Sequence, residues 1–165
     1  MIKNKLLIAL GLTLLSLATP TLHADYFKKI EPRLFQVVDD KRVDYKKPAT
    51  NPQYTALYFS AHWCPPCRAF TPKLVEWYKE FKAKHENFEL VFVSSDKSEK
   101  AQIEYMKEAG MPWPAAKFSA TSDPNFRKYA PSGIPYLVLI GEDGKALTEK
   151  EGAGKTMKKI EELVK

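Results

Sequence analysis

Two cysteines stand three residues apart in the stretch YFSAHWCPPCRAF, which spans residues 58–70. Cys64 and Cys67 are the only cysteines of the chain, and Pro65 and Pro66 lie between them. Three kinds of chemistry suit such a pair: a structural disulfide, two ligands of a metal ion, or a redox couple that cycles between dithiol and disulfide. The surrounding residues discriminate among them.

The first two possibilities have little support in the sequence. A structural disulfide here would close a very small loop, which the chain-entropy relation values at about 2 kcal/mol, against about 4.7 kcal/mol for a loop of 100 residues. A zinc site needs four protein ligands, or three and a water molecule. Only His62 is close to the cysteines, because His85 is about five helical turns further on and His23 is near the start of the chain. We therefore expect no metal ion.

A redox couple explains the position of the cysteines as well as their spacing. They follow the apolar run YTALYFSA (residues 54–61), which predicts a buried strand. Apolar residues then recur at helical spacing at Phe70, Leu74, Trp77, Tyr78 and Phe81. Pro65 suits the first helical position. The free amides and the dipole of a helix start favour an anion, so we expect a thiolate with a lowered pKa at Cys64.

The spacing also predicts separate roles for the two thiols. Cys67 lies one turn deeper on the same helix face, so we expect it to be shielded and Cys64 to be exposed. Cys64 would attack a substrate disulfide, and Cys67 would then resolve the mixed disulfide.

Trp63 is expected as a partly exposed ring beside Cys64. For His62 we favour a solvent-facing loop position over a role in stabilising the thiolate, and we place Trp113 in the core.

The rest of the chain predicts elements that can hold this site. Further buried strands are expected at residues 88–96 and 133–140, and helices at residues 98–109 and 122–130 and in a closing segment. We expect Ser95 or Asp96 to cap the helix at residues 98–109. A turn at residues 141–145 leads into a last antiparallel strand. Alternating strands and helices predict an α/β fold with a mixed central sheet of four to five strands and helices on both faces.

Residues 1–24 have the composition of a secretory signal peptide. Lys3 and Lys5 precede an apolar run of 13 residues, and the small Ala24 marks a plausible cleavage site. A membrane-spanning helix needs about 20 apolar residues. We therefore expect cleavage near Ala24 and export to the periplasm or the extracellular space.

Residues 25–165 form a single expected domain. This segment holds 24 basic and 20 acidic residues, a net charge of +4, and the two signs are interspersed without a basic block. Nucleic-acid binding is therefore not expected. No glycine-rich phosphate loop is present, so the cysteine pair is the only redox group that we expect, with no separate cofactor. We expect a monomer.

Three elements resemble the thioredoxin family: WCPPC after a buried strand, GIP before a later strand, and Pro72 within the first long helix. Over roughly residues 54–140, the stretches YFSAHWCPPCRAFTPKLVEWY, FELVFVSSD and MPWPAAKF resemble its tryparedoxin and nucleoredoxin branch. The resemblance implies a thioredoxin-like fold, a cis bond between Ile134 and Pro135, and a substrate strand that pairs with the backbone of Ile134. Thioredoxins proper carry an acid where this chain has Tyr58, so proton transfer at Cys67 must use water or a group that the sequence does not identify.

Seven residues make up the expected site, in three roles. They are the catalytic Cys64 and Cys67, the substrate-binding Trp63, Ile134 and Pro135, and the supporting Pro65 and Pro66.

We expect an exported thiol–disulfide oxidoreductase that reduces disulfides in protein substrates. Because an oxidising compartment supplies no electrons, such a reductase needs a donor, which we expect to be embedded in the membrane. Two alternatives stay open. One is a disulfide oxidase or isomerase, and a reduction potential near −120 mV rather than −270 mV would identify an oxidant. The other is a non-catalytic binding module that uses the groove beside Pro135.

Overall fold

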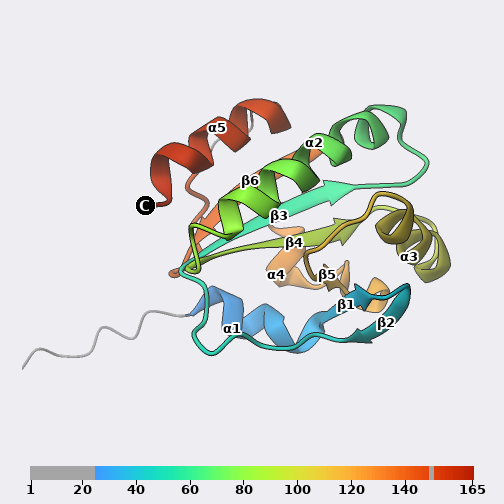
Figure 1. Cartoon of the computed structure of the whole chain (residues 1–165), viewed down its shortest axis with the longest axis horizontal. Helices are drawn as coiled ribbons and strands as arrows, with labels where there is room; N and C mark the ends of the chain where they lie inside the picture. The colour runs from blue at the N-terminus through green and yellow to red at the C-terminus, as the bar shows by residue number, and fades with distance from the viewer. Residues whose placement is uncertain (1–24, 149–150) are drawn as a thin grey trace, which may run out of the picture.

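The computed structural model describes residues 25–148 and 151–165 and places a six-stranded sheet at the centre of the molecule (Figure 1). The strands lie in the order β2-β1-β5-β4-β3-β6. Their bounds are β1 Leu34–Val38, β2 Lys41–Asp44, β3 Tyr54–Ser60, β4 Phe88–Ser94, β5 Ala115–Ala116 and β6 Tyr136–Gly141. The signal peptide expected at residues 1–24 lies outside the described residues. Within the described part of the chain, no helix has the length and apolarity needed to cross a membrane.

The three strands β4, β3 and β6 form the buried half of the sheet, with β6 at its edge. β3 and β4 are parallel, with Tyr54 opposite Phe88 and Ser60 opposite Ser94, and β6 runs antiparallel to β3. Helices cover both faces of these strands, which explains why their sequences are nearly continuous apolar runs rather than alternating patterns. The three predicted buried strands are confirmed, with ends that differ by up to three residues.

The sheet has more strands than the four to five that we predicted. β5 consists of two alanines that pair antiparallel with β1 and parallel with β4, and a segment of two residues is too short to show any hydrophobic period. β2 is exposed along its whole length and joins β1 through Asp39 and Asp40, which both have positive φ. Of the strand expected after residues 141–145, the described residues show an isolated bridge between Ile140 and Ala146, and residues 149–150 lie outside the described part.

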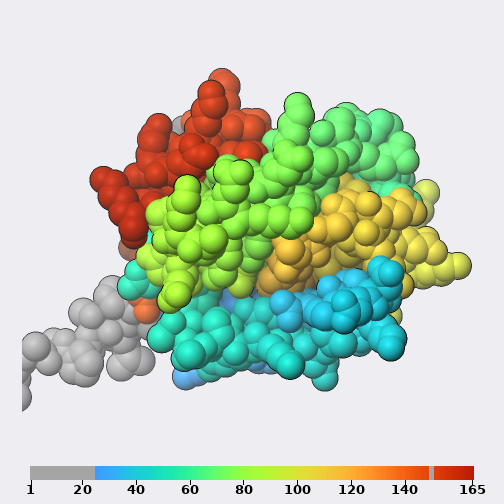
Figure 2. Space-filling view, viewed as in Figure 1, coloured from blue at the N-terminus to red at the C-terminus, as the bar shows by residue number. Residues whose placement is uncertain are grey.

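Helices cover both faces of the sheet, as predicted. Their bounds are α1 Tyr26–Ile30, α2 Pro65–Lys82, α3 Glu99–Glu108, α4 Pro124–Arg127 and α5 Ala153–Leu163, with 3₁₀ turns at Glu31–Arg33 and Phe118–Ala120. α2, α3 and α5 contribute to one apolar cluster, and α1 and α4 contribute to the other. In the space-filling view, the green α2 and the red α5 lie against each other (Figure 2). Trp77 donates a hydrogen bond to Glu161 between these two helices, at 2.8 Å.

Two details of the helices differ from the sequence prediction. Ser98 caps α3 by accepting a hydrogen bond from the Ala101 amide, whereas we expected Ser95 or Asp96 in that role. The five residues of α1 are too few to produce a recognisable periodicity, although three of them are buried. In both cases the sequence signal is short-range. Several neighbouring residues can cap a helix, and five residues do not show a helical period.

The short helix α4 contributes one buried side chain to the apolar core. Phe126 is the buried residue of α4, it is 0% exposed, and it belongs to the apolar cluster that also contains α1. α4 lies in the segment that connects β5 to β6, and this segment leads to the cysteine pair. Phe126 therefore anchors that segment to the apolar core.

We predict that Phe126→Ala lowers the free energy of unfolding by about 3–5 kcal/mol, because it removes a fully buried ring and leaves a cavity. The matched control is Val38→Ala, since Val38 is 48% exposed and its truncation should change stability by about 0.5 kcal/mol or less. Urea unfolding of both variants at unchanged slope measures the difference. Equal midpoints would show that α4 is not anchored in this way.

Candidate active site

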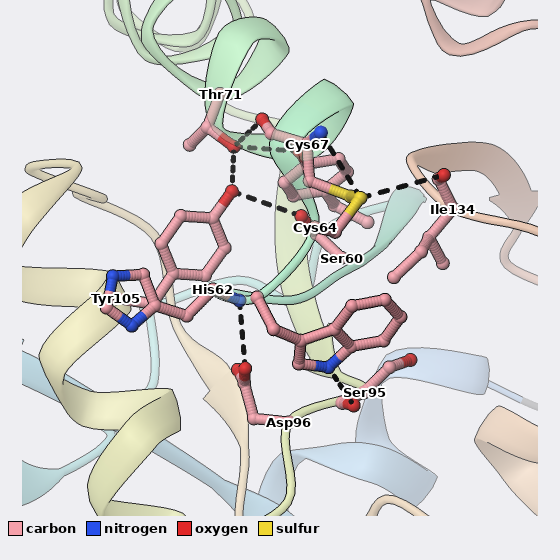
Figure 3. The surroundings of a disulfide bond; sticks show 11 residues. Ser60, His62, Cys64, Cys67, Thr71, Ser95, Asp96, Tyr105 and Ile134 are labelled. Atoms are coloured by element: carbon pink, nitrogen blue, oxygen red, sulfur yellow. Dashed lines mark hydrogen bonds between the residues drawn. A yellow bond between two sulfur atoms is a disulfide. The ribbon is translucent and has the colours of Figure 1, made fainter.

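Cys64 occupies the junction between the end of β3 and the first turn of α2 (Figure 3). It is the N-cap residue of α2, and its Sγ accepts a hydrogen bond from the Cys67 amide at 3.3 Å. The helix begins at Pro65, as predicted. Because Pro65 and Pro66 have no N–H, the amide of Cys67 is the first donor that the helix offers. The helix start thus presents one N–H and its dipole to the sulfur of Cys64.

The two sulfurs are joined in a disulfide, with 5.2 Å between the Cα atoms. Cys64 is 4% exposed and Cys67 is 0% exposed. Cys67 is shielded as expected, but Cys64 is far less exposed than the sequence suggested. The two cysteines differ in what they face, because Cys64 lines an open groove and Cys67 is not among the residues that line it.

The segment before β6 lies against the cysteine pair. The bond between Ile134 and Pro135 is cis, as the family resemblance implied. The carbonyl oxygen of Ile134 is 3.8 Å from the Sγ of Cys64, and the Ile134 side chain packs against Ala61 and both cysteines. Residues 70 positions apart in the sequence therefore form one surface at the disulfide.

Trp63 stands beside Cys64 with 57% of its surface exposed. Its indole N–H donates a hydrogen bond to the carbonyl oxygen of Ser95 at 3.1 Å, just beyond the end of β4. The ring is therefore both exposed and held in place, which agrees with the expected flanking position and not with a place in the core. Trp113, by contrast, is 1% exposed and belongs to the core, as predicted.

A groove of about 700 Å³ opens at the sulfur of Cys64. Trp63 and both prolines of the motif line it together with residues 130–134, and Phe59 of β3 contributes an apolar surface. Arg127 also lines the groove. The groove thus joins the exposed tryptophan, the Cys64 sulfur and the backbone of Ile134 into one continuous surface.

His62 does not occupy the solvent-facing loop position that we predicted. Its ring stacks on Tyr105, with ring centres 5.5 Å apart, and its Nε2 forms a 2.8 Å hydrogen bond with Glu108 of α3. Packing against α3 turns the ring away from Cys64 (Figure 3). His62 and Glu108 are 46 residues apart in the sequence, so only the folded chain brings them together.

Asp96 has a role that the sequence analysis missed. It is 8% exposed, and its carboxylate accepts hydrogen bonds from the His62 amide at 2.8 Å and from the Ser94 hydroxyl at 2.7 Å. The carboxylate therefore ties the turn that carries the cysteines to the end of β4. An acid directly after a buried strand was the available signal, but we assigned it to a helix cap.

The buried hydroxyl groups of Ser60, Thr71 and Tyr105 lie behind the cysteine pair (Figure 3), and that of Tyr58 joins them through Thr71. The Thr71 Oγ1 donates to the carbonyl oxygen of Cys67 at 2.9 Å and is hydrogen-bonded to the hydroxyls of Tyr58, at 2.8 Å, and of Tyr105. Tyr105 is in turn hydrogen-bonded to Ser60 at 3.2 Å. Burial raises the pKa of Tyr58 above its usual value, which keeps this phenol protonated. The sequence had shown only that no acid was present on this strand.

Across residues 25–148 and 151–165, no three His, Cys, Asp or Glu side chains are grouped so that they could hold a metal ion.

A protein-family model described as thioredoxin-like matches residues 51–146. Probable nucleoredoxin 1 from Arabidopsis thaliana is 47% identical over 95 residues, which cover 57% of this chain and 16% of that protein. Human nucleoredoxin is 41% identical over 99 residues, which cover 59% of this chain and 22% of that protein. The match therefore spans about a fifth of the length of these curated relatives.

Solved structures of related proteins have the same fold. Tryparedoxin II from C. fasciculata superimposes with a TM-score of 0.62 at 29% identity, covering 85% of this chain and 89% of that one. A thioredoxin from Wuchereria bancrofti superimposes with a TM-score of 0.57 at 35% identity, covering 75% of this chain and 90% of that one.

We predict that Asp96→Ala lowers the free energy of unfolding by about 1–3 kcal/mol, because the His62 amide and the Ser94 hydroxyl lose their shared acceptor. Denaturant unfolding of the oxidised protein measures the change. The matched control is Asp44→Ala on the exposed strand β2, which should be nearly neutral. If both variants unfold at the same denaturant concentration, Asp96 does not fasten the active-site turn.

Proposed function

Because the chain belongs to the thioredoxin-like family, we propose that it is an exported thiol–disulfide oxidoreductase that reduces disulfides in protein substrates through Cys64 and Cys67. The redox pair and the relation to nucleoredoxins are the premises. The direction of electron flow, the substrate class and export are parts of the proposal.

One observation carries the proposal: the sulfur of Cys64 receives the first amide of α2 and also lines an open groove. The amide and the helix dipole favour the thiolate, which is the nucleophile in disulfide exchange. A structural disulfide would need neither an anion-stabilising position nor access for a partner. Cys67 is completely buried, which suits a thiol that reacts only within the protein.

The proposed reaction has two exchange steps. The Cys64 thiolate attacks one sulfur of a substrate disulfide, so that a bond from Cys64 to the substrate forms and the substrate S–S bond breaks, releasing one substrate thiolate. Cys67 loses its proton and attacks the Cys64 sulfur, which releases the second substrate thiolate. The substrate gains two electrons and, on protonation, two thiol hydrogens, while the protein ends as the disulfide.

The groove supplies a place for the substrate chain. We propose that an extended segment lies along residues 130–134 and pairs with the backbone of Ile134, whose carbonyl oxygen is 3.8 Å from Cys64 Sγ. Trp63 would contact the same segment from the opposite wall, since it is exposed and held by Ser95. Pro65 and Pro66 line the groove and stiffen the turn between the sulfurs.

Export rests on the composition of residues 1–24. The basic start, the apolar run of 13 residues and the small Ala24 support cleavage at that point. Regeneration of the dithiol in an oxidising compartment requires electrons, and we propose a membrane-embedded donor as their source.

Turnover of insulin with dithiothreitol tests the reductase. The wild-type protein should accelerate insulin reduction well above the reagent alone, and Cys64→Ser should abolish the acceleration because no nucleophile remains. Cys67→Ser should accumulate mixed disulfides with substrate proteins, since the resolving thiol is missing. Absence of acceleration would instead indicate a binding module. A reduction potential near −120 mV would indicate an oxidant.

Export is tested separately, by expressing the full chain and sequencing the N-terminus of the accumulated protein. The expected mature protein begins at or near Asp25 and is found outside the cytoplasm. An Ala24→Lys variant should remain uncleaved, because a signal cleavage site needs a small residue there. A full-length protein retained in the cytoplasm would contradict export while leaving the redox chemistry untouched.

A further inference from the structure

Arg127 is the basic residue among the described residues that line the groove beside Cys64. Asp96 is the acidic residue of the same lining, but it is buried. The Asp96 carboxylate already accepts hydrogen bonds from the His62 amide and the Ser94 hydroxyl. The described lining of the groove therefore presents an exposed positive charge at Arg127 and no exposed negative charge.

The guanidinium of Arg127 is free to bind a ligand. Within residues 25–148 and 151–165, neither an ion pair nor a side-chain hydrogen bond joins it to another residue. The acid closest to it in the sequence is Asp123, which pairs with Arg33. The Asp123 carboxylate also accepts a hydrogen bond from the Asn125 amide at 2.8 Å, at the start of α4. The charge of Arg127 is thus left uncompensated by its own helix.

The anchored helix α4 separates Arg127 from the next cation along the chain. Phe126 is fully buried in the apolar core, and consecutive residues of a helix point about 100° apart. The Lys128 ammonium lies 4.7 Å from the ring centre of Tyr129 and 5.6 Å from that of Tyr26, and Lys128 does not line the groove. Two adjacent exposed cations therefore have different surroundings, and only Arg127 belongs to the groove.

The wall that runs from Arg127 to Ile134 leads to the cysteine pair. A chain of seven residues spans at most about 25 Å when fully extended. The substrate segment proposed to pair with Ile134 would advance about 3.3 Å per residue. A substrate residue that meets Arg127 therefore lies within about seven positions of the substrate cysteine.

The chemistry of a guanidinium selects the side chain that it meets. Its planar array of N–H donors matches the two oxygens of a carboxylate, so that both oxygens can be bound at once. A lysine or arginine of the substrate would be repelled at this point, and an uncharged side chain would gain no ion pair.

We propose that Arg127 is a specificity-determining residue that binds a carboxylate side chain of the substrate, so that the protein prefers disulfides flanked by an aspartate or a glutamate. The inference rests on the proposed function and narrows its substrate class to acidic segments. The ion pair holds the segment in the groove while the two exchange steps described above take place. Arg127 itself is neither oxidised nor reduced.

A series of synthetic peptides tests this preference. Each peptide has blocked termini and a single cysteine, linked as a mixed disulfide to the uncharged thiol 2-mercaptoethanol. One glutamate, or a glutamine in the matched peptide, is moved stepwise from the second to about the seventh position on either side of the cysteine. The reduced protein is mixed with each peptide, samples are quenched in acid, and the released peptide thiol is quantified. The measured quantity is the ratio of the rate constants for the glutamate and glutamine peptides.

For the wild-type protein the ratio should reach about three- to fivefold at one or two neighbouring positions and stay close to one elsewhere, a size that suits an exposed ion pair. In Arg127→Gln the ratio should be close to one at every position. In Arg127→Glu the glutamate peptide should become the slower one at the preferred position. Because each ratio compares two peptides on one variant, a general loss of rate cancels.

The matched control is Lys128→Gln, which removes the same charge from the neighbouring residue outside the groove. It should keep the wild-type ratio at every position. A position-independent ratio that Arg127→Gln and Lys128→Gln lower equally would overturn the proposal, because the net charge of +4 over residues 25–165 would then attract acidic peptides without a defined site.

The specificity and the proposed function can fail separately. A wild-type ratio of one at all positions, together with normal insulin reduction, would overturn the role of Arg127 alone. Failure of insulin reduction would overturn the proposed reductase. The peptide ratios would still be measured in that case, because a single exchange by the reduced protein needs no turnover.

Discussion

The hydrogen bond from the Cys67 amide to the Cys64 sulfur is the contact on which the rest of the site depends. It requires α2 to begin directly after Cys64, because only an N-cap residue can accept an amide from the first turn. Two prolines at the first helical positions leave that amide as the first available donor. β3 must end just before this point, and its buried pairing with β4 and β6 fixes where it ends.

Around this contact the molecule is asymmetric. On one side, Cys64 lines the groove formed with Trp63 and residues 130–134. On the other side, Cys67 is enclosed, and the helix turn that carries it is hydrogen-bonded to a buried cluster of hydroxyls. One sulfur therefore belongs to a surface and the other to the interior, although their Cα atoms are 5.2 Å apart. The proposed division into an attacking thiol and a resolving thiol follows from this difference in surroundings.

Much of the fold could be predicted because its main elements carry local signals. The apolar runs of β3 and β4 and the helical stripe from Phe70 to Phe81 each identify an element without knowledge of its neighbours. The elements that escaped prediction are short: the two residues of β5 and the five of α1 gain their place from tertiary packing. His62 was misplaced for a related reason, since the partners of its ring, Tyr105 and Glu108, lie more than 40 residues further along the chain.

The sequence by itself determined the reactive pair, the start of the helix at Pro65 and the buried strand before it, because each depends on residues within one or two turns of each other. Only the tertiary structure decided what surrounds the sulfurs. The Asp96 carboxylate reaches the His62 amide across 34 residues, and Tyr105 reaches Thr71 across the same separation. Such contacts depend on how α2, α3 and the sheet pack, and a buried hydroxyl or carboxylate finds its partner only after that packing exists.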